Sequence, residues 1–223
     1  MRFGLGRSIG SRLFIILLIL SLVPAAGISL VFYLEFSQSL HQDGMAKLGL
    51  VAEKYAEGLD LWLAAHQRKV EALASLPALT SLDPAVALPV LREFATKDQE
   101  AEFYFLARLD GTRWRSDGSQ DNISDREYFQ RFSKEKKVLW SRAEHSKATG
   151  APRVVVVAPV YRPDGILAGL AGMALSLNRL NEYVSRLSIG GTGYPYIVDS
   201  EGLCIAHPVR ENVLKLNITR SGS

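Results

Sequence analysis

Arg126 and the aromatic residues after it are the side chains in this sequence best suited to chemistry with a small molecule. They stand in the stretch SDREYF at residues 124–129. A planar guanidinium can hold a carboxylate through two parallel hydrogen bonds, and Tyr128 offers an apolar wall that carries a hydroxyl group. This pattern indicates an anion-binding site. The alternative is that Arg126 pairs on the surface with Asp125 or another nearby acid.

Other reactive side chains lack the arrangement that catalysis or metal binding requires. The histidines have no metal-ligand spacing, the aspartates of residues 110–121 lack the spacing of a calcium-binding loop, and the nearby serines have no adjacent histidine. The single cysteine excludes an intrachain disulfide, and its apolar neighbours predict that it is buried. The residues concerned are His41, His66, His145, His207, Asp110, Asp117, Asp121 and Cys204. We therefore expect no catalytic residue, no metal and no cofactor.

The excess basic charge lies at the N-terminus. The chain has 26 Lys plus Arg against 23 Asp plus Glu, a net charge of +3, and Arg2, Arg7 and Arg12 account for the whole excess. The rest of the chain is neutral, so nothing in its charge favours a nucleic-acid partner.

An uncharged segment follows these arginines. Leu13–Leu34 contains 22 uncharged residues, and at about 1.5 Å per residue it is long enough to cross a hydrocarbon core of about 30 Å. The positive-inside rule places residues 1–12 in the cytoplasm and the rest outside the inner (plasma) membrane. A cleavable signal peptide is the alternative, because Pro24–Gly27 supplies small residues. However, the apolar run resumes at Ile28 and is longer than a secretory signal needs.

Residues 35–76 have the pattern of a long amphipathic helix that leaves the membrane. Apolar residues recur at steps of three and four, although glycines weaken the helix. The apolar positions are Leu48, Val51, Ala52, Tyr55, Leu59, Trp62, Leu63, Val70 and Leu73. Such a helix needs a surface to lie on, either a packed domain or a second copy, so we expect a homodimer. Pro77 ends the helix, and Asp83 should cap a short helix that runs to about Thr96.

The following residues predict an antiparallel sheet and hence an α+β fold. Strands are expected at 103–109, 112–116, 153–161 and 166–177, with a turn at Asp110-Gly111 and a polar loop at 117–124. Ser124 or Asp125 should cap a helix that ends near Lys134, and another helix is expected at 176–187. After a glycine-rich turn at 190–193, the pattern of residues 103–111 recurs at 194–202, which indicates an incomplete second module at 190–223.

The order of these elements resembles the double Cache extracellular sensor domain of bacterial chemoreceptors, sensor histidine kinases and diguanylate cyclases. The likeness covers roughly residues 37–210 and rests on four stretches: 124–129, 146–161, 164–177 and 191–208. The resemblance implies PAS-like modules, with a membrane-distal module at 77–189 that binds a small molecule. It also implies that Arg126, Tyr128 and Phe129 line the pocket.

The sequence departs from the amino-acid-binding branch of that family at three positions. A Tyr and two Asp residues of the branch are replaced here by Glu144, Ser146 and Ala174. Without those carboxylates, only Glu144 is available to neutralise a ligand's ammonium group. We therefore expect an organic acid rather than an α-amino acid, with Glu144 and Ser146 added to the candidate site.

The resulting interpretation is a membrane-anchored sensor for signal transduction, chemotaxis or a two-component system. It is not expected to be an enzyme, and any kinase or cyclase output would lie beyond this chain. An envelope scaffold or protein-binding module is the main alternative, and an exported hydrolase is a weaker one because no catalytic set is visible.

Overall fold

The computed structural model describes the backbone of residues 9–146, 149–187, 189 and 193–220. It describes their side chains except at residues 9–13, 15, 31 and 34–46. The chain divides into two compact units, Met1–Tyr55 and Ala56–Ser223. Most of the predicted tail at 1–12 and of the predicted turn at 190–193 lies outside the described residues.

Helix α1 (Ile9–Ala74) is one continuous helix of 66 residues that includes Pro24. The predicted long helix is therefore present, and it begins earlier in the chain than residue 35. Within the described residues, no helix has both the length and the hydropathy needed to cross a membrane. The predicted span at 13–34 includes positions whose side chains lie outside the described set.

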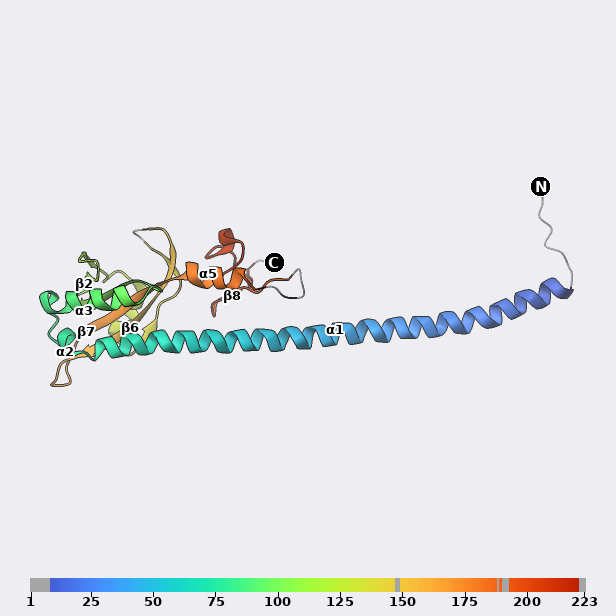
Figure 1. Cartoon of the computed structure of the whole chain (residues 1–223), viewed down its shortest axis with the longest axis horizontal. Helices are drawn as coiled ribbons and strands as arrows, with labels where there is room; N and C mark the ends of the chain where they lie inside the picture. The colour runs from blue at the N-terminus through green and yellow to red at the C-terminus, as the bar shows by residue number, and fades with distance from the viewer. Residues whose placement is uncertain (1–8, 147–148, 188, 190–192, 221–223) are drawn as a thin grey trace. The chain divides into compact units, whose positions relative to one another are not determined.

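The second unit is built on a seven-stranded sheet, and the predicted antiparallel sheet is confirmed (Figure 1). All neighbouring strands are antiparallel. In spatial order the strands are β3 (Gln120–Asn122), β2 (Thr112–Arg115), β1 (Ala101–Arg108), β7 (Leu167–Ser176), β6 (Pro152–Tyr161) and β4 (Leu139–Trp140), and β5 (Glu144–His145) also pairs with β6.

Two sequence predictions near Ser124 were wrong. The segment expected to be a loop contains strand β3, and helix α4 (Glu127–Glu135) has Arg126 as its N-cap. Ser124 lies two residues before the N-cap, and its backbone N–H and hydroxyl both donate to Asn122 Oδ1, at 2.9 and 2.6 Å. The local turn after β3 therefore uses Ser124, and the helix starts three residues later.

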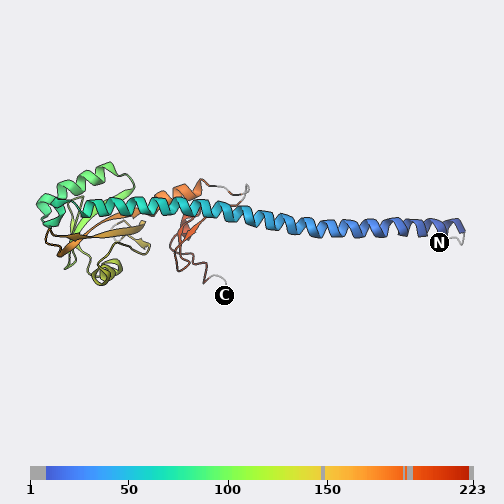
Figure 2. The same ribbon diagram turned by 90° about the horizontal axis from the view of Figure 1, so that it is seen from below.

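The sheet buries apolar side chains on both faces because successive residues of a strand point to opposite sides. On one face, Tyr104 and Leu106 of β1 pack with residues of α1, α2 (Pro77–Thr80) and α3 (Pro84–Lys97). On the other face, Phe103 and Phe105 pack with residues of α4. Figure 2 shows α1 and α3 on the side of the sheet opposite α4. As predicted, Asp83 caps α3 by accepting from Ala85 N–H.

The end of α1 is joined to this unit by apolar and polar contacts together. Val70 and Leu73 are fully buried in the core. The segment Asp98–Glu100, directly before β1, supplies the acids for the polar contacts. Those contacts are the hydrogen bonds from Lys69 Nζ to Asp98 Oδ2 at 2.8 Å and from Trp62 Nε1 to Glu100 Oε2 at 3.0 Å; the buried His66 Nε2 lies 2.8 Å from the same Glu100 oxygen without forming a hydrogen bond. We call this set the α1 clasp.

The C-terminal part of the described chain contains helix α5 (Leu177–Ser185), strands β8 (Ile197–Val198) and β9 (Cys204–Ala206), and a 3-10 turn at Arg210–Asn212. The hydroxyl of Ser176 caps α5, and Cys204 is buried, as expected from its apolar neighbours. The two-stranded sheet agrees with the predicted hairpin. A second module larger than this hairpin stays a prediction.

Gly172, like Gly169 on the same strand, is a position where the central sheet has no room for a side chain. Its partners are Phe105 on β1 and Val157 on β6, and an added Cβ would lie 2.5 Å from Phe105 Cζ and 2.8 Å from the Val156 carbonyl oxygen. We expect Gly172→Ala to lower the free energy of unfolding in urea by about 1–3 kcal/mol through overpacking.

Gly58→Ala is the matched control for this substitution. Gly58 lies in α1 with nothing within 4 Å of an added Cβ, so the change should stabilise the helix by up to about 1 kcal/mol. A Gly172→Ala variant as stable as the wild type would contradict the close packing of β1, β7 and β6.

Candidate functional site

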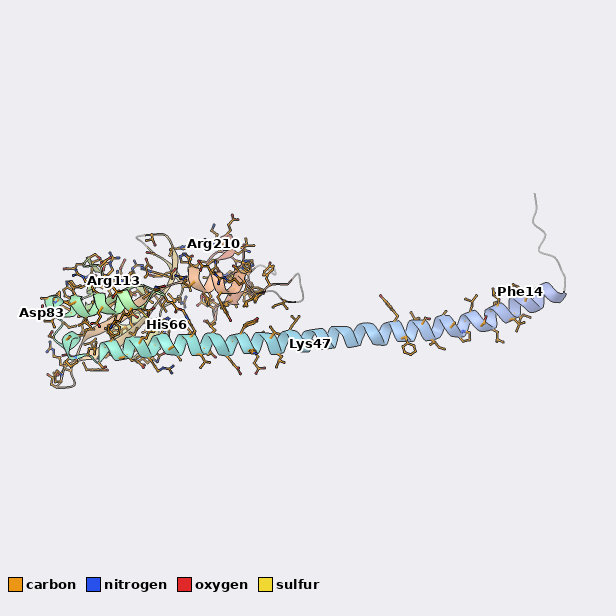
Figure 3. All side chains as sticks on the ribbon, in the orientation of Figure 1. Phe14, Lys47, His66, Asp83, Arg113 and Arg210 are labelled. Atoms are coloured by element: carbon orange, nitrogen blue, oxygen red, sulfur yellow. The ribbon has the colours of Figure 1, made fainter. Side chains whose placement is uncertain are left out.

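Buried arginines gather on the α4 face of the sheet. Arg113 of β2 and Arg153 of β6 are each 2% exposed, and the side chain of Arg126, at the start of α4, is 12% exposed. Figure 3 labels Arg113 in this unit. A guanidinium does not lose its proton in a protein, so each buried arginine needs acceptors and a balancing negative charge.

Arg113 has an acid of its own, and strand register supplies it. The β2–β3 pairing places Arg113 directly opposite Asp121. Arg113 Nε donates to Asp121 Oδ1 at 2.8 Å, and Nη2 donates to Oδ2 at 2.5 Å. The remaining Nη1 donates to the Tyr128 hydroxyl at 3.3 Å. This ion pair uses both carboxylate oxygens of Asp121, so the charge of Arg113 is neutralised within the protein.

Arg153 and Arg126 share one carboxylate. The β5–β6 pairing places Glu144 opposite Arg153, and Arg153 Nε and Nη2 donate to Glu144 Oε1 at 3.2 and 3.0 Å. Arg126 Nη1 lies 3.3 Å from both oxygens of the same group. The Glu144 side chain is 25% exposed, so the shared carboxylate has access to solvent.

The aromatic ring of Phe103 forms the apolar side of this cluster. The guanidinium carbons of Arg115, Arg113 and Arg153 lie 5.2, 5.3 and 5.6 Å from its centroid. Each distance is within the range of a cation–π contact, which stabilises a cation that has been removed from water. The ring therefore holds several guanidinium groups near one another.

The structure brings the five predicted site residues onto this face. Arg126 and Glu144 are in direct contact. The Ser146 hydroxyl accepts from Arg153 Nη1 at 3.4 Å, Tyr128 contacts Arg113, and Phe129 is buried in the adjacent apolar cluster. The alternative that Arg126 pairs with a nearby acid holds in part: Asp125 Oδ1 lies 4.0 Å from Arg126 Nε, and the closer acid is Glu144, which is partly buried.

Sequence reasoning missed the other members of the cluster, Arg113, Arg153, Asp121 and Phe103. A signal for Arg153 was present, because it has the same strand parity as the inward-facing Val155 and Val157. Asp121 was considered only as a calcium ligand, and nothing local to β2 identifies it as the partner of Arg113.

Burial and charge together set the ionisation of this cluster. Burial by itself would raise the pKa of the Asp121 carboxyl group, but the hydrogen bonds and the charge of Arg113 outweigh it and hold the pKa below its usual value. Burial raises the pKa of the Tyr128 phenol, and the charge of Arg113 offsets this only in part. At neutral pH, Asp121 is therefore a carboxylate and Tyr128 is protonated.

The arrangement is suited to holding an anion. Guanidiniums with fixed positions bind a carboxylate by charge and by geometry together. Among the described residues, no group of three or more His, Cys, Asp or Glu side chains is placed to hold a metal ion.

Loss of the Arg113 partner should change the pH dependence of stability. The folded-state pKa of Asp121 is depressed, so its contribution is present above the unfolded-state pKa of about 3.9 and disappears as the pH falls through the folded-state value. Asp121→Asn should be less stable than the wild type near pH 7, and the gap should narrow below about pH 4.

Urea unfolding at a series of pH values measures that gap. Asp60→Asn, which removes an exposed carboxylate from α1, is the control. A gap for Asp121→Asn that stays constant from pH 7 to pH 3 would show that the carboxylate charge is not what stabilises the pair.

The chain is similar to known proteins of sensory systems. The family model of the Cache domain matches residues 36–223. A methyl-accepting chemotaxis protein, PscA of Pseudomonas syringae pv. tomato, is 32% identical over 68 residues, which are 30% of this chain and 11% of that protein. The match therefore spans about a tenth of the relative's length.

Two solved structures share the fold. The extracellular domain of mmHK1S-Z3, named as a histidine kinase, has a TM-score of 0.65 and 19% identity over 76% of this chain and 73% of its own. The ligand-binding domain of the amino acid chemoreceptor PctC of Pseudomonas aeruginosa PAO1, in complex with GABA, has a TM-score of 0.64 and 21% identity over 75% of this chain and 77% of its own. Because the family model covers most of the sequence, this chain belongs to the Cache domain family.

Proposed function

We propose that this chain is the sensor part of a membrane receptor, which binds a small organic acid on the α4 face of the sheet and transmits the binding event across the membrane. The observation that carries the proposal is the pair of guanidiniums, Arg126 and Arg153, that converge on a partly exposed carboxylate. Ligand sensing agrees with membership of the Cache family.

The residues around the two arginines support an acid over an amino acid. Ala174, at a position where amino-acid-binding relatives are expected to have an aspartate, is fully buried in the apolar cluster. Ser146 is bonded to Arg153, and the Glu144 carboxylate is already held by two guanidiniums. A ligand ammonium group would therefore find few free acceptors near Arg126.

The uncharged segment Leu13–Leu34 supports a membrane anchor in this proposal. Its length matches a hydrocarbon core, and Arg2, Arg7 and Arg12 precede it. The N-terminus is then cytoplasmic, and the Cache domain faces the periplasm or the exterior.

For the long helix, we propose a second copy of the chain as the partner. Leu48 and Val51 of α1 are exposed apolar side chains three residues apart on one side of the helix, and pairing of two such helices would cover them. Disulfide crosslinking of cysteines placed along residues 48–73 would detect the dimer. Crosslinks that do not respond to saturating ligand would contradict a signalling role for the helix.

Arg126→Ala should weaken binding of the organic acid about 10- to 150-fold, which corresponds to the loss of one hydrogen bond to a charged group. Calorimetry of the full chain in mild detergent, against panels of organic acids and amino acids, measures this loss. Arg131→Ala is the matched control, because Arg131 lies on α4 and pairs with Glu127 and Glu135. Binding of amino acids without any organic acid would refute the proposed ligand class.

The anchor is tested by cell fractionation. The full chain should stay with the membranes after alkaline extraction, and a version without residues 1–34 should be released, since it has lost its apolar segment. Mass measurement of the membrane-bound form should give the uncleaved chain. A soluble, shortened product would instead identify residues 13–34 as a cleaved signal peptide.

A further inference from the structure

Glu144 is held in the way that a bound carboxylate is held. Its Oε1 accepts from Arg153 Nε and Nη2 at 3.2 and 3.0 Å, and Arg126 Nη1 lies 3.3 Å from Oε1 and Oε2. Two guanidiniums on different elements, the start of α4 and strand β6, thus meet on one acidic group. This is the geometry by which arginines recognise a ligand's carboxylate.

Among the acids near Arg126 and Arg153 in the described residues, only Glu144 is hydrogen-bonded to them, whereas Asp125 and Glu102 lie at ion-pair distance. Asp125 is 4.0 Å from Arg126, and Glu102 is 3.9 Å from Arg153. Arg113 is already neutralised by Asp121. Two guanidiniums therefore share one hydrogen-bonded carboxylate.

Of the three groups, Glu144 is the one that can leave. Its side chain is 25% exposed, whereas those of Arg126 and Arg153 are 12% and 3% exposed. It stands on the two-residue strand β5, which pairs with β6. The Glu144 carboxylate already contacts water, so little free energy is lost when it turns outward and becomes fully hydrated. A buried guanidinium that is left without an acceptor is strongly destabilised, so the two arginines stay in place.

We propose that Glu144 is an internal substitute for the ligand: its carboxylate occupies the place between Arg126 and Arg153 that a ligand carboxylate takes, and the ligand binds by displacing it. This inference rests on the proposed function. It gives Glu144 the opposite role to that of an ammonium acceptor, and it restricts the ligand to compounds with a carboxylate that can replace the one in place.

Glu144→Gln tests the displacement through the direction in which the affinity for the ligand changes. The apparent affinity of a site that is closed most of the time is reduced by the fraction that is open. Glutamine keeps the shape but competes less for the guanidiniums, so the affinity for acetate and succinate should rise, by about tenfold if Glu144 occupies the place 90% of the time. The measurement is calorimetry of the full chain in mild detergent, with sodium chloride at matched ionic strength as the reference.

Glu144→Ala provides a second readout by chemical rescue. It leaves Arg126 and Arg153 without their shared acceptor, so acetate should raise the melting temperature of this variant more than that of the wild type. Glu127→Gln, which removes a half-exposed carboxylate from the same region, should behave like the wild type in both assays.

Three outcomes overturn the inference. The first is that Glu144→Gln binds acetate and succinate as the wild type does, or more weakly. The second is that this variant selectively loses binding of glycine, an amino acid, which would make Glu144 an ammonium acceptor. The third is that acetate does not raise the melting temperature of Glu144→Ala. Failure of the proposed function looks different: the wild type would bind no compound of either panel, while acetate could still rescue Glu144→Ala. The two ideas can therefore fail separately.

Discussion

The α4 face of this domain is organised by a requirement of arginine chemistry. A guanidinium keeps its charge when it is buried, so the surrounding structure must supply acceptors and negative charge. Arg113 and Arg153 meet that requirement through cross-strand partners, Asp121 and Glu144, and through the ring of Phe103. The positions of the short strands β3 and β5 matter for this reason. They carry the acids, and a change in their register would leave a buried charge unmatched.

The same sheet also packs against the C-terminal end of α1. Along β1, Phe103 and Phe105 belong to the arginine side, whereas Tyr104 and Leu106 belong to the side covered by α1 and α3. The bulge between Ala101 and Phe103 brings Glu102 to within 3.9 Å of Arg153. The strand directly after the α1 clasp therefore begins beside the candidate site.

Local patterns in the sequence predicted the elements well and the site only in part. The cap at Asp83 and the antiparallel strands follow from signals within a few residues, and Arg126 was identified by its place in a stretch that resembles the Cache family and by its suitability for anions. The pairs Arg113–Asp121 and Arg153–Glu144 depend on which strands adjoin and in what register, which no short stretch encodes. A charged residue on a strand ordinarily faces water, so the buried arginines were not recognised. The start of α4 was misplaced because its N-cap, Arg126, makes no side-chain capping hydrogen bond and so leaves no capping signal in the sequence.

The α1 clasp has a mechanical consequence. An axial shift of α1 would take the fully buried Leu73 out of its place in a close-packed core, and it would also break the hydrogen bonds of Trp62 and Lys69 with Glu100 and Asp98. The indole N–H of Trp62 donates in one direction only, so its contact with Glu100 is lost when the helix moves. Axial travel of α1 against the sheet would therefore require buried side chains to repack and hydrogen bonds to re-form together, rather than a small continuous slide.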